Sequence, residues 1–170
     1  STLFKTLTGE DVPIDDGLFT TLSTTTRVMN LLGVPVLLTD TVGFIDRLPI
    51  TLVEAFRSTL EETIFADLIL LVVDISEPED EIRRKLDCCL NTLREIGATG
   101  MPIIAVLNKM DLLSDEELQS KIASLGDYSF DLVPVSALHR MNIDELKVKI
   151  AGHILRHVKS LAVIPINGDS

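Results

Sequence analysis

The chain has 170 residues, 46% of them apolar, and a formal net charge of −11 at pH 7. This composition predicts one globular domain with a substantial core and excludes a disordered chain. The negative charge argues against a broad nucleic-acid-binding surface, since phosphate binding draws on Lys and Arg, whereas one nucleotide held by backbone amides and a metal ion is compatible with it.

The apolar runs and the cysteines indicate in which cellular compartment the protein is expected. The longest apolar runs, such as residues 68–73, have the length of strands and fall short of the roughly 20 residues that span a bilayer, and no signal peptide is recognisable. Cys88 and Cys89 are adjacent, so neither a disulfide between them nor a CxxC-type metal site is expected. We therefore expect a cytoplasmic protein with no membrane span.

The first part of the chain predicts a helix followed by a hairpin. Residues 1–9 are typical of a helix that ends at a glycine cap. A weaker strand at residues 24–32 is expected to pair antiparallel with a strand at residues 34–39 around Gly33.

The rest of the chain alternates between buried strands and amphipathic helices. Further strands are predicted at residues 68–73, 103–107 and 132–135. Helices are predicted at residues 50–64, 78–96, 114–125 and 143–159. The tail, residues 161–170, is expected to be a short extended exit. The alternation predicts an α/β fold with a doubly wound, mostly parallel sheet.

Ligands of open α/β sheets bind outside the carboxyl ends of the strands, and a DxxG motif follows the strand at residues 34–39. In it, Asp40 could hold Mg²⁺, usually through water, and Gly43 could turn its backbone N–H towards a γ-phosphate. In the stretch LFTTLSTTTR before this strand, we expect Thr21 to complete the metal shell when a γ-phosphate is present and to swing away after hydrolysis. Thr21 and Gly43 are therefore the expected catalytic residues. An ordinary turn and strand-forming threonines are the alternative interpretation.

An NKxD motif, Asn-Lys-Met-Asp, follows the strand at residues 103–107. The carboxylate of Asp111 could accept both N1–H and the exocyclic amine of guanine, a pair of donors that adenine lacks. Asn108 would tie neighbouring loops together, and the stem of Lys109 would cover the plane of the base. A polar loop leading into a helix is the alternative.

The tripeptide Ser136-Ala137-Leu138 follows the strand at residues 132–135. The backbone N–H of Ala137 could reach the guanine oxygen. The tripeptide carries little weight alone, but DxxG, NKxD and SAL occur in the right order at successive strand ends. Together they predict a domain that binds GTP and GDP with Mg²⁺.

On these motifs and the segments around them, the sequence resembles the HflX family of translational GTPases. The resemblance covers nearly the whole chain and is carried by LFTTLSTTTR, LLTDTVGFIDRLP, LVEAFRSTLEET, ADLILLVVD, LNKMD and VSAL. It implies a G domain of the P-loop GTPase type with sheet order 2-3-1-4-5-6, GTP hydrolysis with Mg²⁺, and association with the large ribosomal subunit.

The resemblance also implies a P-loop directly before the chain. Ser1 would then be the P-loop hydroxyl that ligates Mg²⁺, and Thr2 the next residue of the phosphate-binding helix. We therefore expect residues 1–160 to be a G domain truncated at its N-terminus, lacking its first, central strand and the P-loop, and residues 161–170 to be a C-terminal extension. Without that strand, its two neighbours in the sheet would have exposed apolar edges.

Phe44 follows the DxxG glycine, where Ras-like GTPases place a glutamine that orients the attacking water. A phenyl ring cannot make those hydrogen bonds, which indicates slow intrinsic hydrolysis with the water positioned by another group or by a partner. The ring could equally pack against the helix at residues 50–64. Two other functions stay open: a degenerate G domain that acts as a non-enzymatic ribosome- or protein-binding module, and a ribosome-assembly or tRNA-modifying branch of the GTPases.

Three histidines, His139, His153 and His157, are candidate metal ligands. His153 and His157 have the i, i+4 spacing that can share a metal, but no third ligand is close in sequence. A solvated helix end, where His suits the negative pole of the dipole, is the preferred interpretation.

Overall fold

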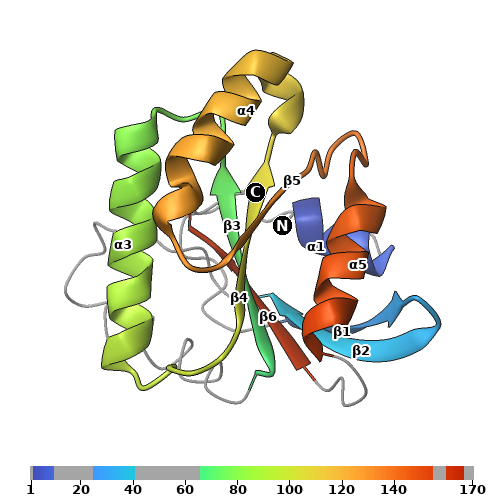
Figure 1. The fold of residues 1–170 in the computed structure, drawn as a ribbon. Coiled ribbons are helices and arrows are strands. Elements are labelled where there is room, and N and C mark those ends of the chain that lie inside the picture. Colours follow the sequence, from blue (N-terminus) through green and yellow to red (C-terminus); the bar gives the residue numbers. More distant parts are fainter. Residues whose placement is uncertain (1, 10–24, 41–65, 155–159, 167–170) are drawn as a thin grey trace.

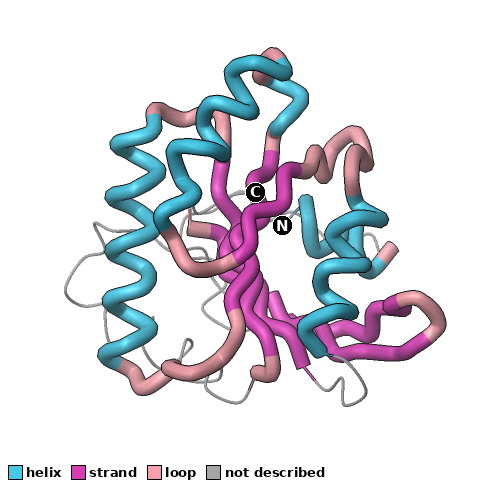
Figure 2. Tube along the Cα trace, viewed as in Figure 1, coloured by secondary structure: helices cyan, strands magenta, loops and turns pink. Residues whose placement is uncertain are grey.

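The computed structural model describes residues 2–9, 25–40, 66–154 and 160–166. Within these residues the chain forms one six-stranded sheet with helices on both faces (Figures 1 and 2). The strands, in their order across the sheet, are β1 (Thr25–Leu31), β2 (Val34–Asp40), β6 (Ser160–Pro165), β3 (Leu68–Asp74), β4 (Ile103–Asn108) and β5 (Asp131–Pro134). Every neighbouring pair except β1–β2 is parallel. The predicted α/β fold with a mostly parallel, doubly wound sheet is therefore confirmed.

β1 and β2 form the antiparallel hairpin predicted from the sequence. Leu31 pairs with Val34, which leaves Leu32 and Gly33 as a two-residue turn with φ angles of 50° and 90°. Positive φ at both turn residues matches the right-handed twist of the two strands. The Oδ1 atom of Asn30 accepts the N–H of Gly33 at 2.8 Å, which stabilises the turn.

β6, formed by the C-terminal tail, lies in the middle of the sheet. It is parallel to β2 on one side, where Leu161 lies opposite Leu38, and to β3 on the other, where Val163 lies opposite Leu70. The expectation of a short extended exit is therefore wrong for residues 161–165, which lie in β6. β2 and β3 both pair with β6, so the edges expected to be exposed between them are covered. An apolar run of this length becomes a strand only through its pairing partners, which lie far away in the sequence.

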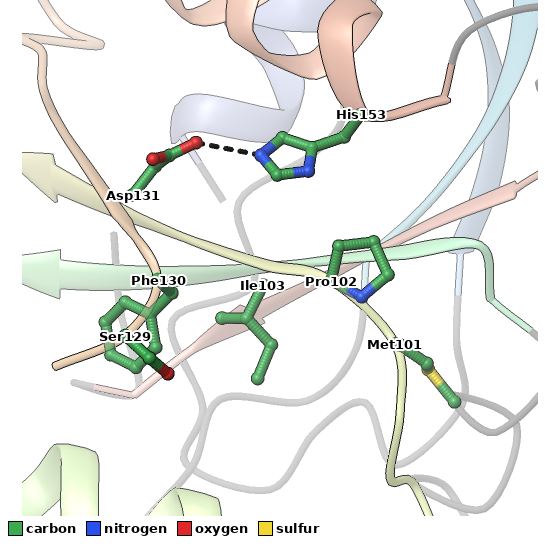
Figure 3. Close-up of a pocket in the computed structure, with 7 residues that line it drawn as sticks. All are labelled: Met101, Pro102, Ile103, Ser129, Phe130, Asp131 and His153. Atoms are coloured by element: carbon green, nitrogen blue, oxygen red, sulfur yellow. Dashed lines mark hydrogen bonds and ion pairs between the residues drawn. The ribbon is translucent and has the colours of Figure 1, made fainter.

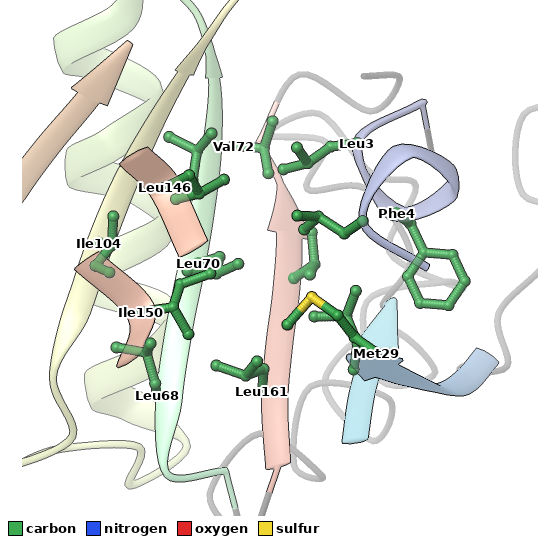
Figure 4. Close-up of a cluster of buried hydrophobic side chains, with 14 of the residues drawn as sticks. Leu3, Phe4, Met29, Leu68, Leu70, Val72, Ile104, Leu146, Ile150 and Leu161 are labelled. Carbon is green, nitrogen blue, oxygen red and sulfur yellow. The ribbon is translucent and has the colours of Figure 1, made fainter. Parts of the chain in front are cut away.

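Two layers of helices cover the sheet. One face carries α1 (Thr2–Thr8) and α5 (Ile143–Ile154), and the other carries α3 (Glu79–Glu95) and α4 (Asp115–Ser124). Because successive side chains of a strand point to opposite faces, β6 sends Leu161 and Val163 into the first core and Ile164 into the second. Figure 4 shows the first core, where side chains of α1, β6 and α5 converge.

The helix ends follow the predicted signals. α1 ends before Gly9, which has a φ of 73° and donates its N–H to the carbonyl of Lys5 at 2.8 Å. α4 opens with a capping box in which Ser114 and Glu117 each accept the backbone N–H of the other. The predicted helix at residues 50–64 and the last turns of the helix predicted to reach residue 159 lie outside the described residues.

Candidate functional site

The carboxyl ends of the parallel strands place polar side chains along one edge of the sheet. β2 ends at Asp40, β3 at Asp74 and β4 at Asn108. Asp74 and Asn108 are register partners, so their side chains start from neighbouring positions. The DxxG and NKxD motifs both begin at this edge, which is where open α/β sheets bind ligands.

Asn108 is buried, with 4% of the residue exposed, and connects three loops. Its Oδ1 atom accepts the backbone N–H of Lys109 at 2.9 Å and that of Ala137 at 3.0 Å. Its backbone carbonyl accepts the N–H of Ile75 at 3.0 Å. The tie between loops that the sequence predicts for Asn108 is therefore present, and it satisfies an oxygen that would be costly to bury alone.

Lys109 is held at both ends. Its backbone is left-handed, with φ 69° and ψ 30°, and its Nζ atom donates to Oδ2 of Asp74 at 3.1 Å. The Lys109 side chain is 42% exposed and that of Asp74 14%. Burial acts to raise the pKa of the Asp74 carboxyl, but hydrogen bonds from Ser76 and Lys109 outweigh it, so this pKa lies below its ordinary value.

Asp111, the proposed base-reading carboxylate, lies in the short 3₁₀ turn Met110–Leu112 that follows β4. Its side chain is 19% exposed, and the Nε2 atom of His139 lies 3.5 Å from its Oδ2 atom. His139 itself is 57% exposed. Asp111 therefore lies beside the loop after β5, which carries His139, and part of its side chain is exposed to solvent.

The Ser136-Ala137-Leu138 segment forms the loop after β5. Ser136 is buried and Leu138 is 75% exposed, while Ser136 and Met141 exchange backbone hydrogen bonds that close the loop. The N–H of Ala137, which the sequence analysis assigned to a guanine oxygen, donates to Asn108 here. Binding a base through this N–H would require it to share or exchange that bond.

α1 is connected to the same loop. The hydroxyl of Thr6 lies within hydrogen-bond distance of the Thr2 carbonyl, at 2.9 Å, and of the Ala137 carbonyl, at 3.0 Å. Thr2 occupies the first position of α1. The predicted phosphate-binding helix and the predicted base-binding loop are thus in direct contact through Thr6.

Asp40 suits a hard cation. It is half-buried at the end of β2, and its Oδ1 atom is buried. Mg²⁺ prefers carboxylate oxygens and keeps several of its waters, so this carboxylate fits the predicted metal role. The other predicted metal and switch residues, Ser1, Thr21 and Gly43, lie outside the described residues, as does Phe44.

A shallow pocket of about 310 Å³ lies at the opposite, amino end of β4 and β5 (Figure 3). It is lined by Met101, Pro102, Ile103, Ser129, Phe130, Asp131 and His153. His153 Nε2 lies 2.8 Å from Oδ2 of Asp131. Among the described residues, no group of three potential metal ligands gathers here or elsewhere. His153 instead has Asp131 as its partner, and His157 lies outside the described residues.

Asp74 and Thr6 are site residues that the sequence analysis missed. Asp74 could have been found, because it is a polar residue that ends a buried strand, as Asp40 and Asn108 do. Thr6 gives no such signal, because its contact with the loop after β5 depends on how α1 packs.

This fold, with Asp40 and the NKxD and SAL segments at one edge of the sheet, defines the G domain of a P-loop GTPase. A family model described as 50S ribosome-binding GTPase matches residues 1–109, more than half of the chain, and the chain belongs to this family. Within the family it is an HflX-like G domain.

The relatives support this placement. The chain is 47% identical to GTPase HflX of Thermofilum pendens over 146 residues, covering 86% of this chain and 34% of that protein. It is 52% identical to GTPase HflX of Thermococcus kodakarensis over 122 residues, covering 72% and 28%. A GTP-binding protein of Sulfolobus solfataricus, solved in complex with GDP, matches with a TM-score of 0.72 at 33% identity, covering 89% of this chain and 47% of that one. The chain thus spans about a third of the length of the curated relatives it matches.

None of the helices in the described residues has the length and apolarity that crossing a bilayer requires.

Proposed function

We propose that this domain binds GTP and GDP at the carboxyl ends of β4 and β5, with Asp111 reading guanine. The observation that supports this most directly is the Asn108–Ala137 hydrogen bond, which brings the NKxD and SAL loops together. The Asp111 carboxylate is partly shielded from water, which strengthens the hydrogen bonds that it would accept from a base. The exposed parts of Lys109 and Leu138 provide apolar surface for the planes of the base.

We infer that the phosphates and Mg²⁺ lie along the same edge, towards β2. Asp40 would hold Mg²⁺, with Ser1 and Thr21 as further ligands, and Gly43 would donate its N–H to the γ-phosphate. Thr2 would lie in the helix that faces the phosphates. When bound, Mg²⁺ neutralises charge that develops on the phosphates during GTP hydrolysis.

Nucleotide displacement tests the assignment of the base-reading carboxylate. Fluorescent GDP bound to the wild type is displaced with GDP or ADP, and the series is repeated with Asp111→Asn. We expect the wild type to prefer GDP and the variant to lose that preference, because the amide replaces one of the two acceptor oxygens with an NH₂ donor, which cannot pair with a guanine N–H. Asp131→Asn, at the opposite end of the sheet, is the matched control. An Asp111→Asn protein that keeps the full guanine preference would overturn the assignment.

We further propose that the intact protein acts in the cytoplasm on the large ribosomal subunit. The description of the matching family, 50S ribosome-binding GTPase, supports this partner, and both cysteines are free thiols, as in a reducing compartment. Co-sedimentation with separated ribosomal subunits, in GDP and in a non-hydrolysable GTP analogue, tests it. No association with the large subunit in any nucleotide state would contradict it.

We propose that intrinsic GTP hydrolysis is slow and that the ribosomal partner accelerates it, because Phe44 cannot orient a water molecule. Phosphate release measured with and without large subunits tests this proposal. Equal rates would exclude stimulation, and no turnover in either case would favour the non-enzymatic module over the enzyme.

A further inference from the structure

The carboxylate of Asp74 is oriented by hydrogen bonds from Ser76 that do not involve Lys109. It lies at the end of β3, its side chain is 14% exposed, and its Oδ1 atom accepts the backbone N–H of Ser76 at 3.0 Å and the Ser76 hydroxyl. These two bonds leave Oδ2 facing Lys109, whose Nζ atom lies 3.1 Å away. Asp74 is therefore a preset anchor for this lysine.

The loop that carries Asp74 and Ser76 is itself held in place. Lys121 of α4 donates from Nζ to the carbonyl of Ile75 at 2.9 Å and to that of Glu77 at 2.7 Å. Ile75 also donates its N–H to the Asn108 carbonyl. Asp74 thus lies in a segment that is hydrogen-bonded to both β4 and α4. An isolated ion pair on the surface would not have this support.

A lysine side chain that is fixed at its tip has already lost much of its rotamer freedom. In Lys109 the backbone N–H is held by Asn108 and the Nζ atom by Asp74. The side chain between these two points stays 42% exposed. A ligand that packs on a stem already ordered in this way does not have to order it on binding.

We propose that Asp74 is a positioning residue of the guanine site, which holds the Lys109 side chain in the conformation that receives the base. This inference rests on the proposed guanine-binding function. Asp74 does not touch the base and acts only through Lys109. Replacing Asp74 should therefore no longer change nucleotide affinity once Lys109 has lost the ammonium group that donates to Asp74.

A double-mutant cycle tests the coupling. Fluorescent GDP affinity is measured for wild type, Asp74→Asn, Lys109→Met and the double variant. We expect Asp74→Asn to weaken GDP binding about tenfold, within the range of coupling between contacting residues, and to have no further effect in the Lys109→Met background. The positioning role would be overturned if Asp74→Asn weakened GDP binding equally in the wild-type and Lys109→Met proteins, or if it did not weaken binding in the wild-type protein.

Two further variants separate positioning from a loss of fold. Ser76→Ala removes one of the bonds that orient Asp74, so it should weaken GDP binding in the same direction but less. Glu77→Gln breaks the neighbouring ion pair with Lys85, at 2.8 Å, and should leave affinity unchanged. Weakening by Glu77→Gln as large as that by Asp74→Asn would indicate a general loop effect and overturn the proposal.

The outcome also distinguishes this inference from the proposed function. If Asp111→Asn and Lys109→Met both leave guanine affinity unchanged, the base site is misassigned. If they weaken it and Asp74→Asn does not, only the positioning role is wrong.

Discussion

The carboxamide oxygen of Asn108 and the backbone nitrogen of Ala137 lie 3.0 Å apart, although the two residues are far apart in the sequence. The bond joins the loops after β4 and β5 at the carboxyl edge of the sheet. Because the same oxygen also accepts the Lys109 N–H, a single buried side chain sets the spacing of the NKxD and SAL motifs.

Asn108→Ala should destabilise the domain by about 1–3 kcal/mol, because two backbone N–H groups lose their acceptor in a buried position. Urea unfolding followed by circular dichroism measures the change. Asn30→Ala is the matched control, since it removes one bond to Gly33 in an exposed turn. An Asn108→Ala variant no less stable than Asn30→Ala would show that the tie contributes little.

Leu161→Ala should cost about 2–5 kcal/mol of unfolding free energy. Leu161 lies in β6, between β2 and β3, and its fully buried side chain packs in the first core, so its truncation leaves a cavity there. Leu37→Ala, on the neighbouring strand with 45% of the residue exposed, should cost much less. Equal unfolding free energies for the two variants would contradict the central placement of β6.

Cys89 should resist thiol reagents in the folded protein. It is fully buried in α3, and burial raises the pKa of its thiol to about 12, so little reactive thiolate forms near neutral pH. The measurement is labelling by a chromogenic disulfide in a Cys88→Ser variant, with and without urea. Reaction only after unfolding is expected, and fast labelling of the folded variant would mean that α3 opens.

Acid should weaken the wild type more than Asp74→Asn. The pKa of Asp74 is lower in the folded chain than its ordinary value of 3.8, so the folded state binds this proton less readily than the unfolded state. The resulting stability is present above that ordinary value and is lost as pH falls through the lowered value. Urea unfolding near pH 7 and near pH 3 checks it, and identical losses in both proteins would contradict the hydrogen-bonded anchor.

Much of the sheet, and the placement of the candidate site at its carboxyl edge, could be predicted from the sequence. The runs before Asp40 and Asn108 are apolar and have the length of strands, and each is followed by a polar motif, so the sequence located the strand ends that carry these motifs. Glycine and capping signals located α1 and α4 for the same local reasons.

The position of β6 could not be predicted in this way. Its residues pair with strands that lie about 90 or more positions earlier in the chain, and no local signal distinguishes a central strand from an exit. The Asp74–Lys109 anchor likewise depends on strand register, which places residue 74 beside residue 108. The roles of Ser1, Thr21 and Gly43 stay predictions, since these residues lie outside the described part of the chain.

Competition among three diphosphates tests the guanine site most directly. GDP, IDP and ADP are used to displace fluorescent GDP from the wild-type protein in Mg²⁺. IDP keeps N1–H but lacks the exocyclic amine, and ADP lacks both donors, so each lost hydrogen bond to the Asp111 carboxylate should cost about 1.5–3 kcal/mol, or roughly ten- to a hundredfold in affinity. We predict the order GDP, IDP, ADP from tightest to weakest, and equal affinity for GDP and ADP would contradict a guanine-reading site at Asp111.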